Sequence, residues 1–394
     1  MGKYDFETVT DRHNTESIKW DCKEDILPRW IADRDYKVAP EIVSALEKRV
    51  LHPVYGYTEP HDNWYHAYRD FFGRRHKIKL EKDWLLFSLG VVPTISSSVR
   101  KLTKEGDNVV LLTPVYNIFY NSVLNNHRVV KEVPLLLKDG NYSIDFPALE
   151  DALKDDKTTR RILCNPANPV GRIWTKEELS EIGRLCYENH VVVLSDEIHG
   201  EIVRPGRTYN PFFAVNEINK NISVNAISVT KPFNLAGIHT SAIIVPNEDL
   251  RKKVNRQINT DEVAEPNIFS CPAAIAALNE GEEWLDERRE HVFYNRDYVS
   301  SFVEKNIAGR KVVPGDATYL VWIDIRKITK DSLIFAKFLK QETGLWLQDG
   351  SVYGKGGEGF LRRNVATPLS LLKDGLKRLE KGTKAFKERA LKTL

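Results

Sequence analysis

The alternation of apolar and polar positions divides the chain into two regions of different texture. Between about residues 45 and 280, short apolar runs alternate with stretches whose apolar residues recur at helical spacing. Repeating strand–helix units of this kind predict a largely parallel sheet covered by helices on both faces. The expected strands are 85–88, 109–112, 128–133, 161–164, 191–195, 223–229 and 241–245.

One helix in this region carries a clear start signal. Thr175 precedes the amphipathic stretch 176–189, and Glu178 follows three residues later, which is the spacing of a capping box. We therefore expect helix 176–189 to begin directly after Thr175.

The pattern changes after Gly281. The elements expected there are a long charged helix over 284–306, a strand at 318–325, a helix at 331–342, a strand at 360–366 and an amphipathic, lysine-rich helix over 373–394. We predict a large domain over 45–280 and a smaller α/β domain formed by 1–44 together with 281–394.

Composition narrows the class of protein. A chain of 394 residues is too long for one ordinary core, and 42% apolar with 29% charged residues is typical of a soluble globular protein. The 58 basic and 55 acidic side chains leave a net charge of +3, which gives no reason to expect a nucleic-acid or membrane partner. The four cysteines form no CxxC pair, the N-terminus lacks an apolar signal region, and no apolar run approaches about 18 residues. We expect a cytoplasmic protein.

Polar side chains follow three of the expected strands. Asn168 lies in NPANPVG, Asp196 in SDEIHG and Lys231 in SVTKPFNLAG. Since the carboxyl edge of an α/β sheet is where such folds bind ligands, one shared site is expected there. A salt-bridged surface lysine and an N-cap role for Asp196 are the structural alternatives. A metal site of Asp196, His199 and Glu201 lacks a second ligand cluster, so no metal is predicted.

Longer motifs carry a resemblance to a known family. They are LPRWIADRDY (27–36), VYGYT (54–58), LGVVPT (89–94), TPVYNIF (113–119), SDEIH (195–199) and GEGFLRRNVATP (357–368). Together with the three strand ends, they resemble the fold-type I pyridoxal-phosphate (PLP) enzymes of the aspartate aminotransferase superfamily, in the branch of cystathionine β-lyases and cysteine-S-conjugate β-lyases. The resemblance runs from about residue 4 to 379. It implies a mostly parallel mixed sheet sandwiched by helices, plus a smaller α/β domain.

The resemblance also assigns roles around the ring of PLP. Lys231 would form a Schiff base with the cofactor aldehyde. Asp196 would pair with the protonated pyridine nitrogen, an attraction of roughly 4 kcal/mol at about 4 Å. The remaining ring contacts would come from Asn168 and His199 at the phenolic oxygen, Ile198 below the ring and Tyr116 above it. Aminotransferases usually carry tyrosine where this chain has His199, so that position favours elimination.

Further positions match the phosphate contacts of the family. They are the turn and amides of Gly90, Val91 and Val92, the hydroxyl of Ser228, and Tyr57, whose counterpart reaches the phosphate of a neighbouring subunit. The last of these implies a homodimer with shared active sites. One departure is His239, which stands where many relatives carry a phosphate-binding arginine.

One arginine, Arg362, is expected to bind the substrate. Arg362 matches the family arginine that clamps a substrate α-carboxylate, and its neighbour Arg363 should point to the opposite face of the strand. The activity implied is α,β-elimination from L-cystathionine or a related cysteine S-conjugate, giving a thiol, pyruvate and ammonia. The freed Lys231 would take the Cα proton, and Tyr116 could protonate the departing sulfur. An aminotransferase and a regulatory protein that keeps the fold are the alternatives, and the sequence does not rank the thioethers.

Methionine occurs only at position 1. Arg29 and Arg34 stand where the lyases that this chain resembles usually carry an apolar residue, often methionine. The sequence alone offers no physical reason for either observation.

Overall fold

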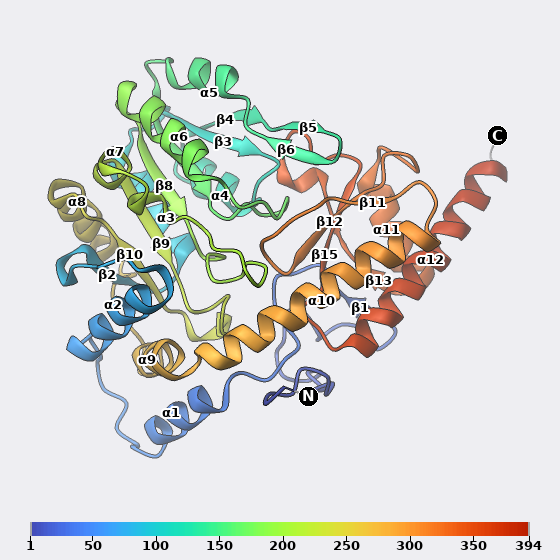
Figure 1. Ribbon diagram of the computed structural model, residues 1–394, viewed down its shortest axis with the longest axis horizontal. Helices are drawn as coiled ribbons and strands as arrows, with labels where there is room; N and C mark the ends of the chain where they lie inside the picture. Colours follow the sequence, from blue (N-terminus) through green and yellow to red (C-terminus); the bar gives the residue numbers. More distant parts are fainter. Residues whose placement is uncertain (1, 393–394) are drawn as a thin grey trace.

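A seven-stranded sheet with helices on both faces forms the centre of the computed structural model, which describes residues 2–392 (Figure 1). The strand order is β2-β10-β9-β8-β7-β3-β4. The strands are β2 (Leu85–Ser88), β3 (Asn108–Thr113), β4 (Val129–Pro134), β7 (Thr158–Cys164), β8 (Val192–Asp196), β9 (Ser223–Ile227) and β10 (Ser241–Ile244). β10 is antiparallel to both of its neighbours and all other pairs are parallel. The expected mostly parallel mixed sheet is therefore confirmed, with all seven expected strands in it.

Both faces of this sheet are buried because side chains alternate along each strand. On β3, Val109 and Leu111 pack in one apolar cluster with α3 (Val91–Leu102), α4 (Ile118–Leu124) and α8 (Glu248–Thr260). Val110 and Leu112 pack in a second cluster with α5 (Phe146–Leu153) and α6 (Lys176–Glu188). This is the strand period of two applied to a sheet covered on both sides.

Helix α6 begins at the predicted residue. The Thr175 hydroxyl accepts from the Glu178 N–H at 3.1 Å, and the Glu178 carboxylate accepts from the Thr175 N–H at 2.9 Å. The reciprocal pair satisfies two N–H groups that a helix start otherwise leaves without partners.

A second sheet has the order β11-β12-β15-β14. Its strands are β11 (Lys311–Val312), β12 (Leu320–Asp324), β14 (Gln348–Asp349) and β15 (Phe360–Asn364), and the helices of this region are α10 (Glu282–Asn306), α11 (Ser332–Thr343) and α12 (Leu369–Lys392). Each element predicted after Gly281 is present. Residues 393–394 of the expected last helix lie outside the described range.

The N-terminal arm joins this second region, since β1 (Leu27–Pro28) pairs with β13 (Leu345–Trp346). The domain boundaries at about 45 and 280 remain a proposal. The other elements are α1 (Pro40–Val50), α2 (Asp62–His76), α7 (Glu217–Asn221), α9 (Ser270–Glu280) and the hairpin of β5 (Leu136–Lys138) and β6 (Asn141–Ser143). Within residues 2–392, no helix combines the length and the apolar character that crossing a membrane requires.

Candidate active site

The polar strand ends meet at one edge of the large sheet. Asp196 is the last residue of β8, Asn168 follows β7, Tyr116 follows β3 and Lys231 follows β9. Gly90 follows β2, which runs in the same sense as β9 because both strands are antiparallel to β10. The predicted residues of the large sheet thus converge on its carboxyl edge, where open α/β sheets bind ligands.

Lys231 is held by a neutral partner. Its Nζ donates to the carbonyl oxygen of Ala32 at 2.8 Å, and the hydroxyl of Tyr319 donates to the same oxygen at 2.9 Å. Within the described part of the chain, no carboxylate forms an ion pair with this amine. The adjoining cleft offers about 480 Å³ to the centres of water-sized molecules, and its walls come from the N-terminal arm, residues 31–37 and the Lys231 loop. An amine beside open space and without a counter-ion is free to react.

Asp196 is a buried carboxylate that needs a cation. Its Oδ1 accepts from the N–H of Ile198 at 3.0 Å. Burial raises the pKa of Asp196 to about 7, an effect that this N–H and the charge of Lys231 only partly offset. A cationic N–H donor brought against the carboxylate would restore its ionised form.

His199 is buried and neutral. Burial, together with the positive charges of Lys231 and three arginines, lowers the pKa of His199 well below its ordinary value. Its Nδ1 is buried without a hydrogen-bond partner among the described residues. Buried polar atoms are normally satisfied, so this nitrogen is available to a bound group.

Arg362 reaches from β15 to the large sheet. Its guanidinium donates to Oδ1 of Asn168 at 3.2 Å and to the carbonyl of Trp30 at 2.9 Å, and it lies 4.9 Å from the ring centre of Tyr353. It forms no ion pair with any carboxylate in residues 2–392, and its Nε has no partner there. A buried guanidinium of this kind suits a ligand carboxylate.

Arg363 lies on the other face of β15, as the strand period predicts. It donates to the carbonyl of Leu372 in α12 at 2.9 Å and is fully buried. The structure therefore separates the two adjacent arginines as expected.

Tyr116 lies among the charged groups of the site. Burial raises its pKa to about 12, while Arg362 lowers it and Asp196 adds to the rise. The phenol is therefore protonated at neutral pH and can donate a proton. The ring also packs edge-on against Phe119, with centroids 5.6 Å apart.

The start of α3 is open to an anion. Gly90 is its N-cap residue, and no side chain caps the N–H groups of Val91 and Val92 in the first turn. Ser228 is more constrained than expected, because its hydroxyl donates to the carbonyl of Thr240 at 2.6 Å. Thr230, which sequence reasoning missed, places its hydroxyl 2.7 Å from that of Ser228. The phosphate role of Ser228 stays a prediction.

Tyr57 and His239 are not brought into the site of their own chain. Tyr57 lies between α1 and α2 and is fully exposed, with a relative accessibility of 103%. His239 is exposed after a short 3-10 helix, Ala236–Ile238, in a left-handed backbone conformation. The inter-subunit role of Tyr57 and the effect of His239 on phosphate binding both stay predictions.

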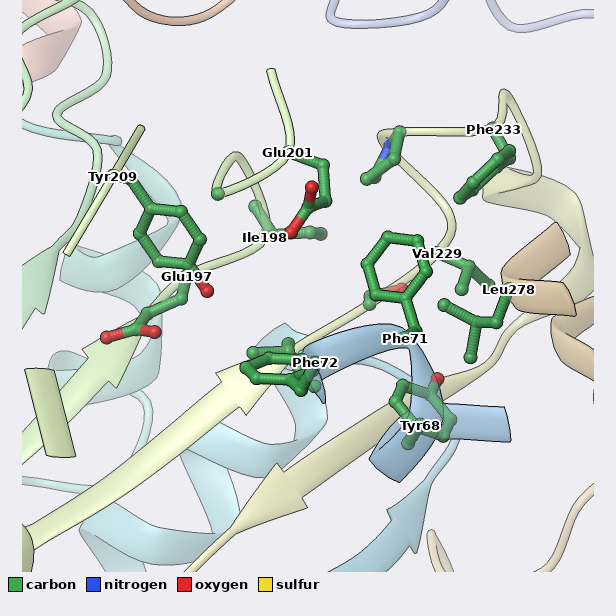
Figure 2. Close-up of a pocket in the computed structure, with 14 residues that line it drawn as sticks. Tyr68, Phe71, Phe72, Glu197, Ile198, Glu201, Tyr209, Val229, Phe233 and Leu278 are labelled. Atoms are coloured by element: carbon green, nitrogen blue, oxygen red, sulfur yellow. The ribbon is translucent and has the colours of Figure 1, made fainter. Parts of the chain in front are cut away.

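A small apolar cavity lies behind the site (Figure 2). Its walls include Phe71 and Phe72 of α2, and Glu197 is directed towards Tyr209 there. The cavity offers only about 30 Å³ to the centres of water-sized molecules, room for one or two waters and too little for an aromatic cofactor.

The residues of the sheet edge fit PLP. The unpartnered Nδ1 of His199 and the raised pKa of the Asp196 carboxyl each call for a polar or cationic group, and the uncapped start of α3 accepts an anion. Lys231 supplies an amine for an aldehyde. These are the four contacts that a phosphorylated pyridine aldehyde requires.

Sequence reasoning missed several partners of these residues. The Ala32 and Trp30 carbonyls, the Tyr319 hydroxyl and the Tyr353 ring come from segments far from the strand-end motifs. Backbone carbonyls leave no mark in a sequence. Only the motif at 27–36 pointed to that part of the arm.

Comparison with known proteins agrees with this geometry. The family model described as "Aminotransferase class I and II" matches residues 32–379. Cystathionine beta-lyase PatB of Bacillus subtilis is 37% identical over 95% of this chain and 98% of the relative. Cystalysin of Treponema denticola, solved with pyridoxal 5'-phosphate, has a TM-score of 0.94 and 32% identity, covering 97% of this chain and 99% of its own. A PLP-bound C-S lyase from Staphylococcus hominis has a TM-score of 0.91 and 28% identity, covering 97% and 98%.

Proposed function

Because the chain belongs to the aminotransferase class I and II family, we propose that it is a PLP-dependent carbon–sulfur β-lyase. The substrate is L-cystathionine or a related cysteine S-conjugate, and the products are a thiol, pyruvate and ammonia. The proposal of an amino-acid substrate rests on one observation, which is that Lys231 and Arg362 are both basic residues with only neutral partners. The near full-length similarity to a protein named cystathionine beta-lyase favours carbon–sulfur cleavage.

The cofactor would be held by residues at or after the ends of five strands of the large sheet, namely β2, β3, β7, β8 and β9. Lys231 would bind its aldehyde carbon, and Asp196 would bind its ring nitrogen. Asn168 and His199 would contact its phenolic oxygen, and Ile198 and Tyr116 would pack against its two faces. The start of α3 would hold its phosphate. When bound, PLP supplies an electron sink for the charge that develops at the substrate Cα.

The protein's own residues supply orientation and proton transfer. Arg362 holds the substrate carboxylate, which fixes the Cα–H bond relative to the neighbouring amine. The Nζ of Lys231 then takes the Cα proton. Tyr116, protonated because its pKa is raised to about 12, donates its hydroxyl proton to the departing sulfur. The remaining three-carbon fragment takes up water and gives pyruvate and ammonia.

The test is a product assay with L-cystathionine as the sole substrate. We expect pyruvate and free thiol in equal amounts over many turnovers. A reaction that requires 2-oxoglutarate and stops after one turnover without it would establish the aminotransferase alternative, which the family's name favours. Parallel assays with L-cystine, L-cysteine and other thioether conjugates rank the substrates.

We also propose a homodimer in the cytoplasm. The support for the homodimer is Tyr57, whose side chain is fully exposed. A twofold partner would cover this residue and receive it at the phosphate end of the second site.

A further inference from the structure

Several arginine side chains are buried with fewer acceptors than a guanidinium requires. They are Arg29, Arg34, Arg161, Arg288, Arg310 and Arg363, each with a relative accessibility between 0% and 7%. For Arg161, Arg288 and Arg310, all three side-chain nitrogens lack a hydrogen-bond partner in the described part of the chain. An isolated buried charge is among the most costly features a fold can contain.

The other three arginines of this group each make a single hydrogen bond. Arg34 donates to the Pro232 carbonyl at 3.0 Å, and Arg363 donates to the Leu372 carbonyl at 2.9 Å. Arg29 forms an ion pair with the carboxylate of Asp35 at 2.5 Å. Each still has a buried nitrogen without a partner in residues 2–392. One bond leaves most of the five N–H donors of a guanidinium unsatisfied.

Two other arginines of the same chain, Arg296 and Arg128, show what a satisfied buried guanidinium looks like. Arg296 donates to the carbonyls of Gly315, Thr318 and Leu320. Arg128 likewise bonds to more than one acceptor. Arg362 also bonds to two acceptors, but its Nε is without a partner in the described residues. Buried arginines of this chain can therefore be supplied with several acceptors, and the six have at most one each within residues 2–392.

The surroundings of Arg161, Arg288 and Arg310, the three arginines without a hydrogen-bond partner among the described residues, suit an apolar side chain. Arg161 lies in the middle of β7, paired with Val110 on one side and Val193 on the other. Burial lowers its pKa to about 10 and that of Arg310 to about 9. Arg288 has its pKa lowered well below the ordinary value by burial and by the neighbouring charge of Arg34. Two cations placed together away from water oppose folding.

Methionine, which this chain lacks after position 1, has a side-chain shape that matches these six positions. Methionine is unbranched, flexible and apolar, and it is among the residues most often buried, yet it occurs only at position 1 of 394. The chain thus lacks methionine throughout its core and has, at six core positions, long unbranched side chains with one hydrogen-bond partner or none in the part of the chain that the structure describes.

We infer that the cell in which this protein is made reads these six positions as methionine, through reassignment of an arginine codon. AGG is the one arginine codon that differs from the methionine codon AUG at a single base. A methionine-charged tRNA that decodes AGG would account for both anomalies together. The inference does not depend on the proposed function.

Methionine in place of arginine at position 34 would change the active site. The guanidinium of Arg34 lies 4.7 Å from the ring centre of Tyr319 and lines the cleft beside Lys231. A methionine sulfur at this distance makes a favourable contact with an aromatic ring. It would also leave the wall of the cleft without the Arg34 charge.

The decisive experiment is tryptic digestion and mass spectrometry of the protein purified from the organism that encodes it. We expect no cleavage after the six positions and methionine in the peptides that span them. Cleavage after Arg128, Arg296 and Arg362 is the internal control. Arginine at the six positions in the native protein would overturn the inference, as would a gene that encodes them with a mixture of arginine codons.

A second experiment measures the physical cost directly. The chain as printed and its six-fold Arg→Met version are made in a host with the standard code, and their thermal midpoints are compared. The methionine version should be soluble and melt roughly 10 °C or more above the arginine version, or be the only one that folds. Arg296→Met, which removes three bonds to carbonyls, should lower the midpoint instead. Equal midpoints for the unsubstituted chain and its six-fold Arg→Met version would contradict the inference.

Discussion

Replacement of Asp196 by asparagine should have opposite effects on the cofactor-free and the cofactor-loaded protein. Without a cofactor, the carboxylate is buried with no cation in contact, and its pKa is raised from 3.8 to about 7. The difference corresponds to roughly 4 kcal/mol of destabilisation once the group is ionised in the folded protein. Asparagine keeps the oxygen that accepts from the Ile198 N–H and carries no charge.

The sign of the pH dependence follows from proton linkage. Between pH about 4 and about 7 the folded, cofactor-free protein holds a proton on Asp196 that the unfolded chain has released. The carboxyl therefore lowers stability progressively as pH rises through this window. Asp196→Asn removes this loss, so the variant's advantage should grow from near zero at pH about 4 to roughly 4 kcal/mol above pH 7. Urea unfolding of both cofactor-free proteins across this pH range measures the difference.

Glu197 provides the matched control. It follows Asp196 in the sequence and is also buried, and burial raises its pKa to about 7. Unlike Asp196, it lies on the side away from the cleft, where its Oε1 accepts hydrogen bonds from Ser195, Asn165 and the Phe212 N–H. Glu197→Gln should stabilise the cofactor-free protein with the same pH profile and leave cofactor retention intact. Asp196→Asn should release PLP and lose activity. If the Asp196→Asn advantage does not change with pH, the carboxyl is not the buried acid described here.

Three further predictions address other residues of the site. Borohydride should remove the visible absorbance of the purified protein and leave the cofactor attached to Lys231 in peptide mass spectra; an adduct on another lysine would contradict the assignment. Arg362→Ala should lower kcat/KM for amino acids roughly tenfold to a hundredfold, because a charge-assisted contact is lost, and should leave the absorbance of the bound cofactor unchanged. Arg363→Met should leave kcat/KM intact. The reverse ranking would exchange the roles of the two arginines. Mixing inactive Lys231→Ala with weakened Tyr57→Ala under conditions of subunit exchange should restore activity, because one site of each mixed dimer keeps both native residues; no recovery despite verified exchange would exclude a shared site.

The large sheet could be predicted because its information is local. Most of its seven strands contain a short apolar run, as in residues 85–87, 109–112 and 192–194. Chain order alone then brought Asn168, Asp196 and Lys231 to one edge, since parallel strands share their carboxyl ends. The two-residue strands β1, β11, β13 and β14 were not predicted, because two residues are too few to show a period.

The partners of the site residues depend on long-range packing instead. Ala32 accepts from Lys231 across 199 positions of the sequence, and Trp30 accepts from Arg362 across 332. Both acceptors are backbone carbonyls of the N-terminal arm, so no side-chain pattern identifies them. The strand period predicted that Arg362 and Arg363 face opposite ways, but only the packing of β15 against α12 and the arm assigns each arginine its face.

The choice of neutral partners explains how the partly buried Lys231 and the buried Arg362 can be held in place and still bind a zwitterionic amino acid. Carboxylates satisfy cations elsewhere in the fold: Lys19 pairs with Asp35 at 2.8 Å, and Arg75 with Glu201 at 3.0 Å. Lys231 and Arg362 are instead held by backbone carbonyls and one amide oxygen, which orient their N–H donors without cancelling the charge. A carboxylate partner on Arg362 would have to be displaced by the substrate, and that exchange would consume most of the binding free energy. The N-terminal arm, by supplying carbonyls and no acid at these two contacts, keeps the site both ordered and receptive.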